Sequence, residues 1–211
     1  STTSVSDLSP VKNSSLKRLD CRSSKVRSVD LTRYPNLEAF VCDNTSINSL
    51  DVSKNEKLNT LFADSTSISN LDVTNNPNLE QLSCSNTGLM ELDVTHNPQL
   101  VTLDIGDTKV KTLDISKNPN LKQLSCYMTN IAELDVTKNT KLTRLFCHDT
   151  TIKKLDLSNN LELEMLRCGE IFEQGIRGLD ISKNTKIKKL ICDDLYWLNV
   201  GENKVLENNH A

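Results

Sequence analysis

The 211-residue sequence has little of several residue types on which compact globular domains rely. Glycine occurs six times, proline occurs five times, and aromatic residues make up 4% of the chain. No apolar run approaches the roughly 20 residues that span a bilayer, so we expect no membrane insertion. The 25 basic and 28 acidic residues are well mixed, which gives no basic footprint for nucleic acid and no polybasic membrane segment.

The sequence does contain a period of 21 residues. An aspartate followed by Val, Ile or Leu and then by Ser or Thr recurs at this spacing seven times, and once more after 24 residues. A fixed short period is the signature of a solenoid, in which each unit buries its apolar face against its neighbours. The aspartates are Asp30, Asp51, Asp72, Asp93, Asp114, Asp135, Asp156 and Asp180.

Each repeat has two similar halves. In the repeat that starts at Leu142, apolar residues at Leu145 and Cys147, and again at Leu155 and Leu157, are two residues apart. A spacing of two places residues on one face of a strand. We therefore predict short parallel strands on both broad sides of a right-handed, curved α/β-class solenoid, with about nine rungs and little helix.

The period sets the domain organisation. Residues 1–15 form an N-terminal segment and partial first turn, 16–192 form the solenoid, and 193–211 form a cap or tail. Three extra residues lie near 169–179, and they are either a harmless insertion or a projecting contact loop. The 21-residue pattern ends after Cys192, and we expect Leu195, Trp197 or Leu198 to cover the last rung.

Two polar positions recur at the corners of the predicted turns, and we interpret both as structural. Their side chains can bond inward-pointing backbone groups that have no ladder partner. Tyr34 and Ser24 are the exceptions in the two columns. Asn stands at 13, 55, 76, 97, 118, 139, 160 and 184, and Thr at 45, 66, 87, 108, 129 and 150.

Stacked aspartates should repel one another, so something in each rung must offset their charge. An Asp side chain that bonds the backbone two residues later forms an Asx-turn, helped by the nearby Ser or Thr. Basic residues three positions on are further candidates, for example Lys54 and Lys138. The alternative is a row of calcium sites, which would need a flexible Gly-rich loop that this repeat lacks.

All seven cysteines occupy one repeat position, where Ala63 and Ile105 complete the column. We expect a ladder of buried thiols that act as small apolar groups. Zinc is disfavoured because the sulfurs are spread over several rungs, and disulfides are disfavoured because parallel strands point neighbouring Cβ atoms the same way. The ladder is Cys21, Cys42, Cys84, Cys126, Cys147, Cys168 and Cys192.

The segment from Leu142-x-x-Leu145-x-Cys147-x-x-Thr150 to Leu155-Asp156-Leu157-Ser158-x-Asn160 resembles the leucine-rich repeat. More narrowly, it resembles the 21-residue cysteine-ladder type of internalin J-like bacterial surface proteins, over roughly residues 8 to 192. This resemblance implies a concave sheet formed by the Cys half, and a role as an extracellular adhesion or ligand-binding module.

The outward positions around the Cys strand vary from rung to rung, whereas those beside the Leu-Asp-Val segment hardly change. We predict that Phe62 and Phe146 are exposed, and that a binding patch surrounds Phe146. Aromatic, Met and Arg side chains on an open face are typical of interface cores, although scattered apolar surface residues are also normal. The candidate ligand-binding residues are Tyr127, Met128, Arg144, Phe146, His148, Met165, Arg167 and Phe62.

The sequence predicts no catalytic residues, no metal and no cofactor. His148 follows Cys147 directly, so the two face opposite sides of a strand and do not form a nucleophile–base pair. We predict a monomeric, non-enzymatic module, extracellular or on the cell surface, with any signal peptide removed or outside this sequence. It would bind a protein or a surface glycan through its concave face. The alternatives are a passive spacer or a fragment of a larger protein, and, third, an enzyme.

Overall fold

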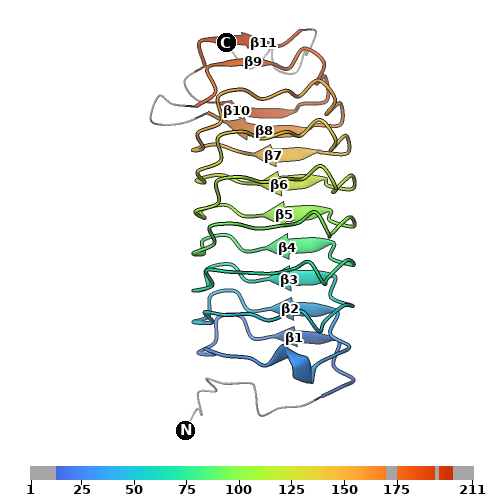
Figure 1. Cartoon of the computed structure of the whole chain (residues 1–211). Helices are drawn as coiled ribbons and strands as arrows, with labels where there is room; N and C mark the ends of the chain where they lie inside the picture. Colours follow the sequence, from blue (N-terminus) through green and yellow to red (C-terminus); the bar gives the residue numbers. More distant parts are fainter. Residues whose placement is uncertain (1–12, 170–174, 193–194, 202–211) are drawn as a thin grey trace.

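A computed structural model describes residues 13–169, 175–192 and 195–201. The chain forms a stack of flat turns, and each turn contributes one strand to a nine-stranded parallel sheet (Figure 1). We number these turns rung 1 to rung 9. The strands, in sheet order, are β1 (Arg18–Asp20), β2 (Ala39–Val41), β3 (Thr60–Phe62), β4 (Gln81–Ser83), β5 (Thr102–Asp104), β6 (Gln123–Ser125), β7 (Arg144–Phe146), β8 (Met165–Cys168) and β10 (Lys189–Cys192).

The register of the sheet confirms the sequence period. Leu61 of β3 pairs with Leu82 of β4, and Leu82 pairs with Leu103 of β5, so equivalent residues lie beside each other in successive rungs. The central leucine of β2 is replaced by Phe40, which is fully buried. The leucines, isoleucines and valines of both halves of the repeat form one continuous core along the stack.

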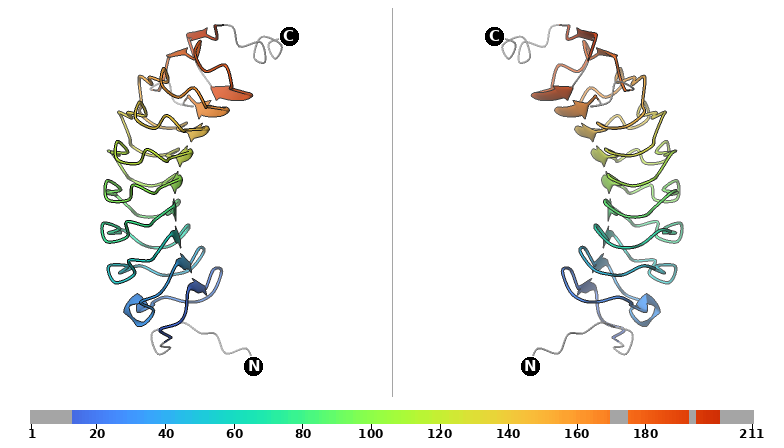
Figure 2. Two further views of the ribbon diagram at one scale, coloured as in Figure 1. Left: turned by 90° about the vertical axis from the view of Figure 1, so that its right-hand side faces the viewer. Right: turned by 90° about the vertical axis from the view of Figure 1, so that its left-hand side faces the viewer.

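The prediction of strands on both broad sides was wrong for most of the chain. The Leu-Asp-Val side has one described strand pair, β9 (Gly178–Asp180) with β11 (Trp197–Asn199), and one short 3-10 helix, η1 (Leu31–Arg33). On this side of the intervening rungs, one backbone hydrogen bond joins each turn to its neighbour, for example the bond from Lys109 N to Leu89 O at 2.8 Å. The stack curves so that the nine-stranded sheet lies on its concave side (Figure 2).

The aspartates shape the convex side through local hydrogen bonds. Asp51 Oδ1 accepts the backbone N–H of Ser53 at 3.0 Å, and Asp135 Oδ1 accepts that of Thr137 at 2.9 Å. These Asx-turns confirm the interpretation made from the sequence, and Asp180 at the end of β9 forms the same turn with Ser182 N. All eight aspartates have a pKa below the ordinary value, because hydroxyl and backbone donors bond the carboxylate.

The basic residues three positions on have a smaller effect than the hydroxyls. The Ser53 hydroxyl is the largest cause of the lowered pKa of Asp51, ahead of the Ser53 N–H and the charge of Lys54. At Asp114 the backbone N–H of Ser116 is the largest cause. Neighbouring carboxylates act in the opposite direction, as Asp93 and Asp51 do on Asp72. Local hydrogen bonds therefore offset most of the repulsion along this column.

The asparagine column ties each rung to the turn before it. Asn76 is fully buried, and its Nδ2 donates to the carbonyl oxygens of Val52 at 3.0 Å and Asn55 at 2.9 Å. The same pair of bonds recurs from Asn55 to Asn184. Asn13 differs, because it is exposed and accepts from Ser15. The buried amides therefore satisfy two carbonyl groups per rung, as predicted.

The three-residue insertion leaves this corner intact. Asn184 donates to Leu157 and Asn160, which lie 27 and 24 residues earlier instead of the usual 24 and 21. The extra residues are therefore accommodated between two unchanged corners. Residues 170–174 lie outside the described residues, so the predicted choice between a harmless insertion and a contact loop stays open.

The threonine column bonds within its own rung instead of across rungs. Thr45 Oγ1 donates to the carbonyl oxygen of Cys42 at 2.7 Å, and Thr150 Oγ1 donates to that of Cys147 at 2.8 Å. Each bond closes the tight turn that follows the Cys strand. The asparagines therefore bond the preceding turn, whereas the threonines close their own turns.

The repeat continues past Cys192, where the sequence pattern was expected to end. Leu198 pairs with Leu179 and Asn199 with Asp180, and Gly201 N donates to Asn199 Oδ1 as Ser182 N does to Asp180. Leu195 and Leu198 pack on the core, as expected of residues that cover the last rung. Trp197 is 57% exposed, and its indole lies so close to Gly178 that a Cβ there would overlap it.

Replacing a buried corner amide by a carboxylate should destabilise the whole stack. In Asn76→Asp, two donated hydrogen bonds become repulsive contacts with two carbonyl oxygens, and the cost should be about 3 kcal/mol or more. Asn75→Asp, at the exposed neighbouring position, should change stability by no more than about 0.5 kcal/mol. Urea unfolding of both variants tests this, and equal stabilities would contradict the role given to the column.

The aspartate column should make the fold sensitive to acid. Because their pKa is lower in the folded state, these carboxylates stabilise the fold above their unfolded pKa, and this contribution is lost as pH falls through the folded pKa. Chemical unfolding between about pH 6 and pH 2 should show the decline. A triple variant, Asp51→Asn with Asp72→Asn and Asp93→Asn, keeps an acceptor that does not titrate, as Asn199 does. Its decline should be shallower, and an unchanged slope would argue against this source.

Candidate binding face

The cysteine ladder lies on the side of the concave sheet that faces the core, and its free thiols have low reactivity. Cys42, Cys84, Cys126 and Cys147 are buried free thiols, and Cys21 is a partly buried one. Burial raises the pKa of Cys147 to about 12 and that of Cys21, with help from Asp20 and Asp43, to about 11. Neutral thiols at physiological pH are poor nucleophiles and poor metal ligands.

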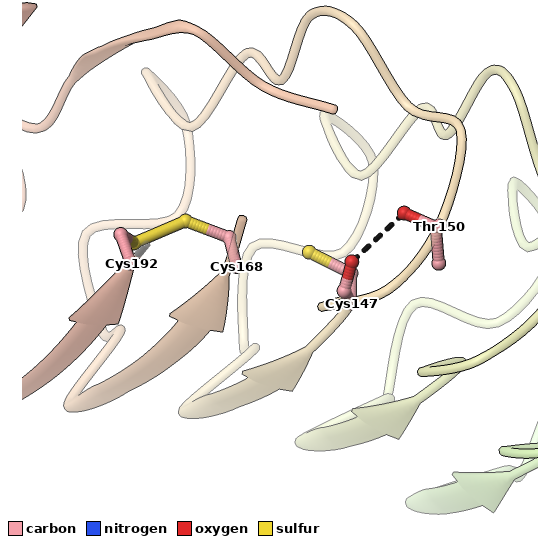
Figure 3. Close-up of a disulfide and its surroundings, with 4 residues drawn as sticks. All are labelled: Cys147, Thr150, Cys168 and Cys192. Atoms are coloured by element: carbon pink, nitrogen blue, oxygen red, sulfur yellow. Dashed lines mark hydrogen bonds between the residues drawn. A yellow bond between two sulfur atoms is a disulfide. The ribbon is translucent and has the colours of Figure 1, made fainter. Parts of the chain in front are cut away.

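The prediction against a disulfide was wrong at one end of the ladder. Cys168 and Cys192 form a disulfide between register partners of β8 and β10, with Cα atoms 4.7 Å apart (Figure 3). Disulfides span Cα separations of roughly 4.4–6.8 Å, so the strand spacing suffices once the side chains turn their sulfur atoms toward each other. Cys147, one rung away in the same column, remains a thiol.

The outer side of the sheet presents three columns of side chains, which we call the concave face. The first and second columns come from the strands, and the third follows the cysteine position. In rung order the first column is Arg18, Ala39, Thr60, Gln81, Thr102, Gln123, Arg144, Met165 and Lys189. The second is Asp20, Val41, Phe62, Ser83, Asp104, Ser125, Phe146, Arg167 and Ile191. The described part of the third is Arg22, Asp43, Asp64, Ser85, Gly106, Tyr127, His148 and Gly169.

The structure brings six of the predicted binding residues together over rungs 6 to 8. Phe146 lies beside Arg167 in the second column, and Arg144 lies beside Met165 in the first. Tyr127 and His148 are neighbours in the third column. We call this set the aromatic–basic cluster, and its members are Tyr127, Arg144, Phe146, His148, Met165 and Arg167.

Tyr127 forms the centre of the third column. Its ring stacks on that of His148, with centroids 5.1 Å apart and planes inclined by 9°. On the other side it lies over Gly106, where a Cβ would overlap the ring. Burial, followed by the charge of Asp104, raises its pKa. The ring therefore extends over rung 5, toward the N-terminal half of the face.

The sequence argument predicted that the two phenylalanines are exposed, but neither is fully exposed. Phe62 and Phe146 are both half-buried, and Phe62 lies four rungs from Phe146, outside the cluster. Val41 and Ser125 are buried although they occupy the outward second column. They are the register neighbours of Phe62 and Phe146, respectively. At strand spacing a large ring shields a smaller neighbour, and alternation along one strand does not capture this effect.

Met128 follows the third column and is 51% exposed. Its φ is +52°, a left-handed conformation that the equivalent residues of six other rungs share. Those six are Ser, Asn or Asp, and short polar side chains tolerate this region better than methionine does. An exposed methionine at a position suited to Asn is a local departure from the repeat, directly beside Tyr127.

Sequence reasoning missed a set of carboxylates on the concave face, which we call the acidic strip. It consists of Asp43 and Asp64 in the third column and Asp104 in the second. Asp64 Oδ1 accepts from Ser85 N at 2.7 Å and from the Ser83 hydroxyl at 2.6 Å. Desolvation raises the pKa of Asp104 and of Asp43. Their irregular spacing, unlike that of the convex aspartates, gave no periodic signal.

Hollows in the described part of the surface lie on the convex side. One of about 770 Å³ is lined by residues that include Leu134, Lys153 and Lys154, and a second of about 400 Å³ lies near Leu92. A third, near Leu155, has a volume of about 300 Å³. Because the Leu, Asp and Ser or Thr of the Leu-Asp-x-Ser/Thr segment line all three, the hollows follow the geometry of the repeat and do not mark one specialised site.

The described residues contain no group of three His, Cys, Asp or Glu side chains arranged to hold a metal ion. Nor does that part of the chain contain a helix long and apolar enough to cross a membrane. What distinguishes the concave face is therefore its variable set of aromatic, basic and acidic side chains on a regular sheet.

No family profile and no curated protein matches the sequence, whereas many solved structures match the fold. A leucine-rich repeat protein from Leptospira interrogans is 18% identical, with a TM-score of 0.78 over 90% of this chain and 53% of that one. YopM, a leucine-rich effector protein from Yersinia pestis, is 21% identical, with a TM-score of 0.72 over 87% of this chain and 51% of that one.

The functional domain of InlJ from Listeria monocytogenes, which includes a cysteine ladder, is 34% identical, with a TM-score of 0.89. The match covers 95% of this chain and 45% of the InlJ chain, so this chain spans less than half of that length. The 21-residue period, the parallel register and the column of cysteines agree with this likeness. The chain belongs to the leucine-rich repeat proteins of the 21-residue cysteine-ladder type, similar to InlJ.

Proposed function

We propose that the chain is a non-enzymatic module that works outside the cell or on its surface and recognises a protein through the concave face. The observation that carries this proposal is the aromatic–basic cluster. Aromatic, Met and Arg side chains are the types enriched in interface cores, and here six of them meet on an open sheet. The convex surface on the opposite side repeats Asp and Ser or Thr almost without change.

The rigidity of the face supports binding. Tyr127 is packed between His148 and Gly106, so little side-chain freedom remains to be lost when a partner docks. The strands beneath it are paired on both sides. A face that is ordered before binding keeps the entropic cost of association low.

Two further observations support the location and the absence of catalysis. The Cys168–Cys192 disulfide fits an oxidising compartment, where such bonds persist. The raised pKa of Cys147 and Cys126, which follows from burial, argues against a thiolate nucleophile. The likeness to the functional domain of InlJ agrees with a role in recognition.

Removing the aromatic centre should abolish binding without unfolding the chain. We expect the intact chain to capture a protein from an array of purified extracellular proteins, with no comparable signal on a glycan array. A double variant, Phe146→Ala with Tyr127→Ala, should weaken that binding by about 100-fold, as truncation of interface anchors does. Surface plasmon resonance measures the loss, and circular dichroism confirms the fold.

Met90→Ala is the matched control, since Met90 is 63% exposed on the convex side. It should leave binding unchanged. Equal binding by the double variant and the wild type would contradict recognition through the cluster, and it would favour a passive spacer.

A further inference from the structure

The charges of the concave face are separated along the stack. In rung 1, Asp20 forms ion pairs with Arg18 at 3.2 Å and with Arg22 at 2.7 Å, so its charge is compensated locally. Over rungs 2 to 5 the three columns carry three carboxylates, the acidic strip, and no cation. Over rungs 7 to 9 their described part carries Arg144, Arg167 and Lys189, and no carboxylate. One half of the face is therefore negative and the other half positive.

The acidic strip is held in place by backbone and hydroxyl donors, and Arg22 of rung 1 is the cation that lowers the pKa of Asp43. Asp43 Oδ1 accepts the backbone N–H of Asp64 at 3.0 Å, and Asp64 in turn accepts from Ser85 and Ser83. Among the described residues, none of the three carboxylates forms an ion pair. Burial raises the pKa of Asp104 and Asp43, which shows that the charged form lacks full compensation.

The basic half has the complementary property. Arg144, Arg167 and Lys189 are exposed and form no ion pair within the described residues. Elsewhere the solenoid does pair charges between neighbouring rungs, as in Lys17–Glu38 and Lys188–Glu164. On rungs 2 to 9 of the concave face the chain places opposite charges several rungs apart, where they cannot pair with each other.

We propose that this face binds a polypeptide whose contact surface is itself dipolar, with cationic side chains over the acidic strip and anionic side chains over Arg144 and Arg167. The proposal rests on the proposed function and adds the charge pattern and orientation of the partner. Phe62, Tyr127 and Phe146 lie between or beside the two charged halves and supply the apolar contact. A uniformly anionic ligand such as nucleic acid would be repelled by the strip.

The spacing of the rungs fixes the scale of this pattern. Asp64 and Arg144 are four rungs apart, which is roughly 19 Å at strand spacing, and Asp43 and Arg167 are six rungs apart, roughly 29 Å. An extended chain advances about 3.3 Å per residue. In an extended ligand that runs along the stack, the basic and acidic residues should therefore be separated by about six to nine positions.

A random 12-residue peptide library displayed on phage is long enough to test this. Peptides selected on the intact chain should carry Lys or Arg and Asp or Glu about six to nine positions apart, with an aromatic or apolar residue between them. Synthetic copies of these peptides should bind the double variant Arg144→Glu with Arg167→Glu at least about tenfold more weakly than the wild type. They should lose a similar amount of affinity for the double variant Asp43→Lys with Asp64→Lys. Lys153→Glu with Lys154→Glu, on exposed convex positions, is the control and should change nothing.

Selection on the Arg144→Glu and Arg167→Glu variant provides a second readout, because its face is acidic along rungs 2 to 8. It should yield uniformly basic peptides. If selected peptides depend on Phe146 and Tyr127 but show no separation of charge, and neither reversal affects them, the dipolar partner is refuted and the proposed function stands. If no selected peptide depends on Phe146 or Tyr127, the proposed function itself fails. A dimer in sedimentation that either reversal dissociates would identify the occupant as a second copy and overturn the proposal.

Discussion

The fold depends on the way each flat turn satisfies its inward-pointing carbonyl groups. A coil of 21 residues has sharp corners, and at a corner the backbone oxygens have no strand partner. Buried asparagines from Asn55 to Asn184 each donate to two such oxygens of the preceding turn. Because both bonds are directional, they fix the height and the register of successive turns together. The alignment of equivalent residues into columns follows from that constraint.

The two sides of the coil use their backbone differently, and this difference decides where variation is tolerated. On the concave side strand pairing satisfies most of the backbone, so most outward side chains can differ, although Asp43 and Asp64 also accept backbone N–H groups of the next rung. On the convex side Asp51 and its equivalents satisfy the backbone through their own side chains, so they must be repeated. Recognition therefore has sequence freedom on the sheet and little on the opposite side.

The period alone predicted the solenoid, its register and its columns, because these follow from counting residues. It did not predict that most segments beside the aspartate column would lack strands, since apolar spacing is the same in a strand and in an Asx-turn. It also failed for the Cys168–Cys192 disulfide and for the burial of Val41 and Ser125. These depend on side-chain rotation and on the size of the neighbour one rung away, which a one-dimensional pattern does not contain. Asp43, Asp64 and Asp104 were missed because their irregular spacing gave no periodic signal.

Departures from the repeat gather where the candidate binding face is most varied. Met128 occupies a left-handed position that its equivalents fill with Ser, Asn or Asp, and Tyr127 needs Gly106 beneath its ring. Asp104 keeps a carboxylate where burial disfavours the charge. Met128 holds a conformation that disfavours its side-chain type, and burial opposes the charge of Asp104 although Gly106 N bonds it. These departures lie in rungs 5 and 6, at the N-terminal edge of the aromatic–basic cluster, where the proposed contact with a partner would be a second requirement besides folding.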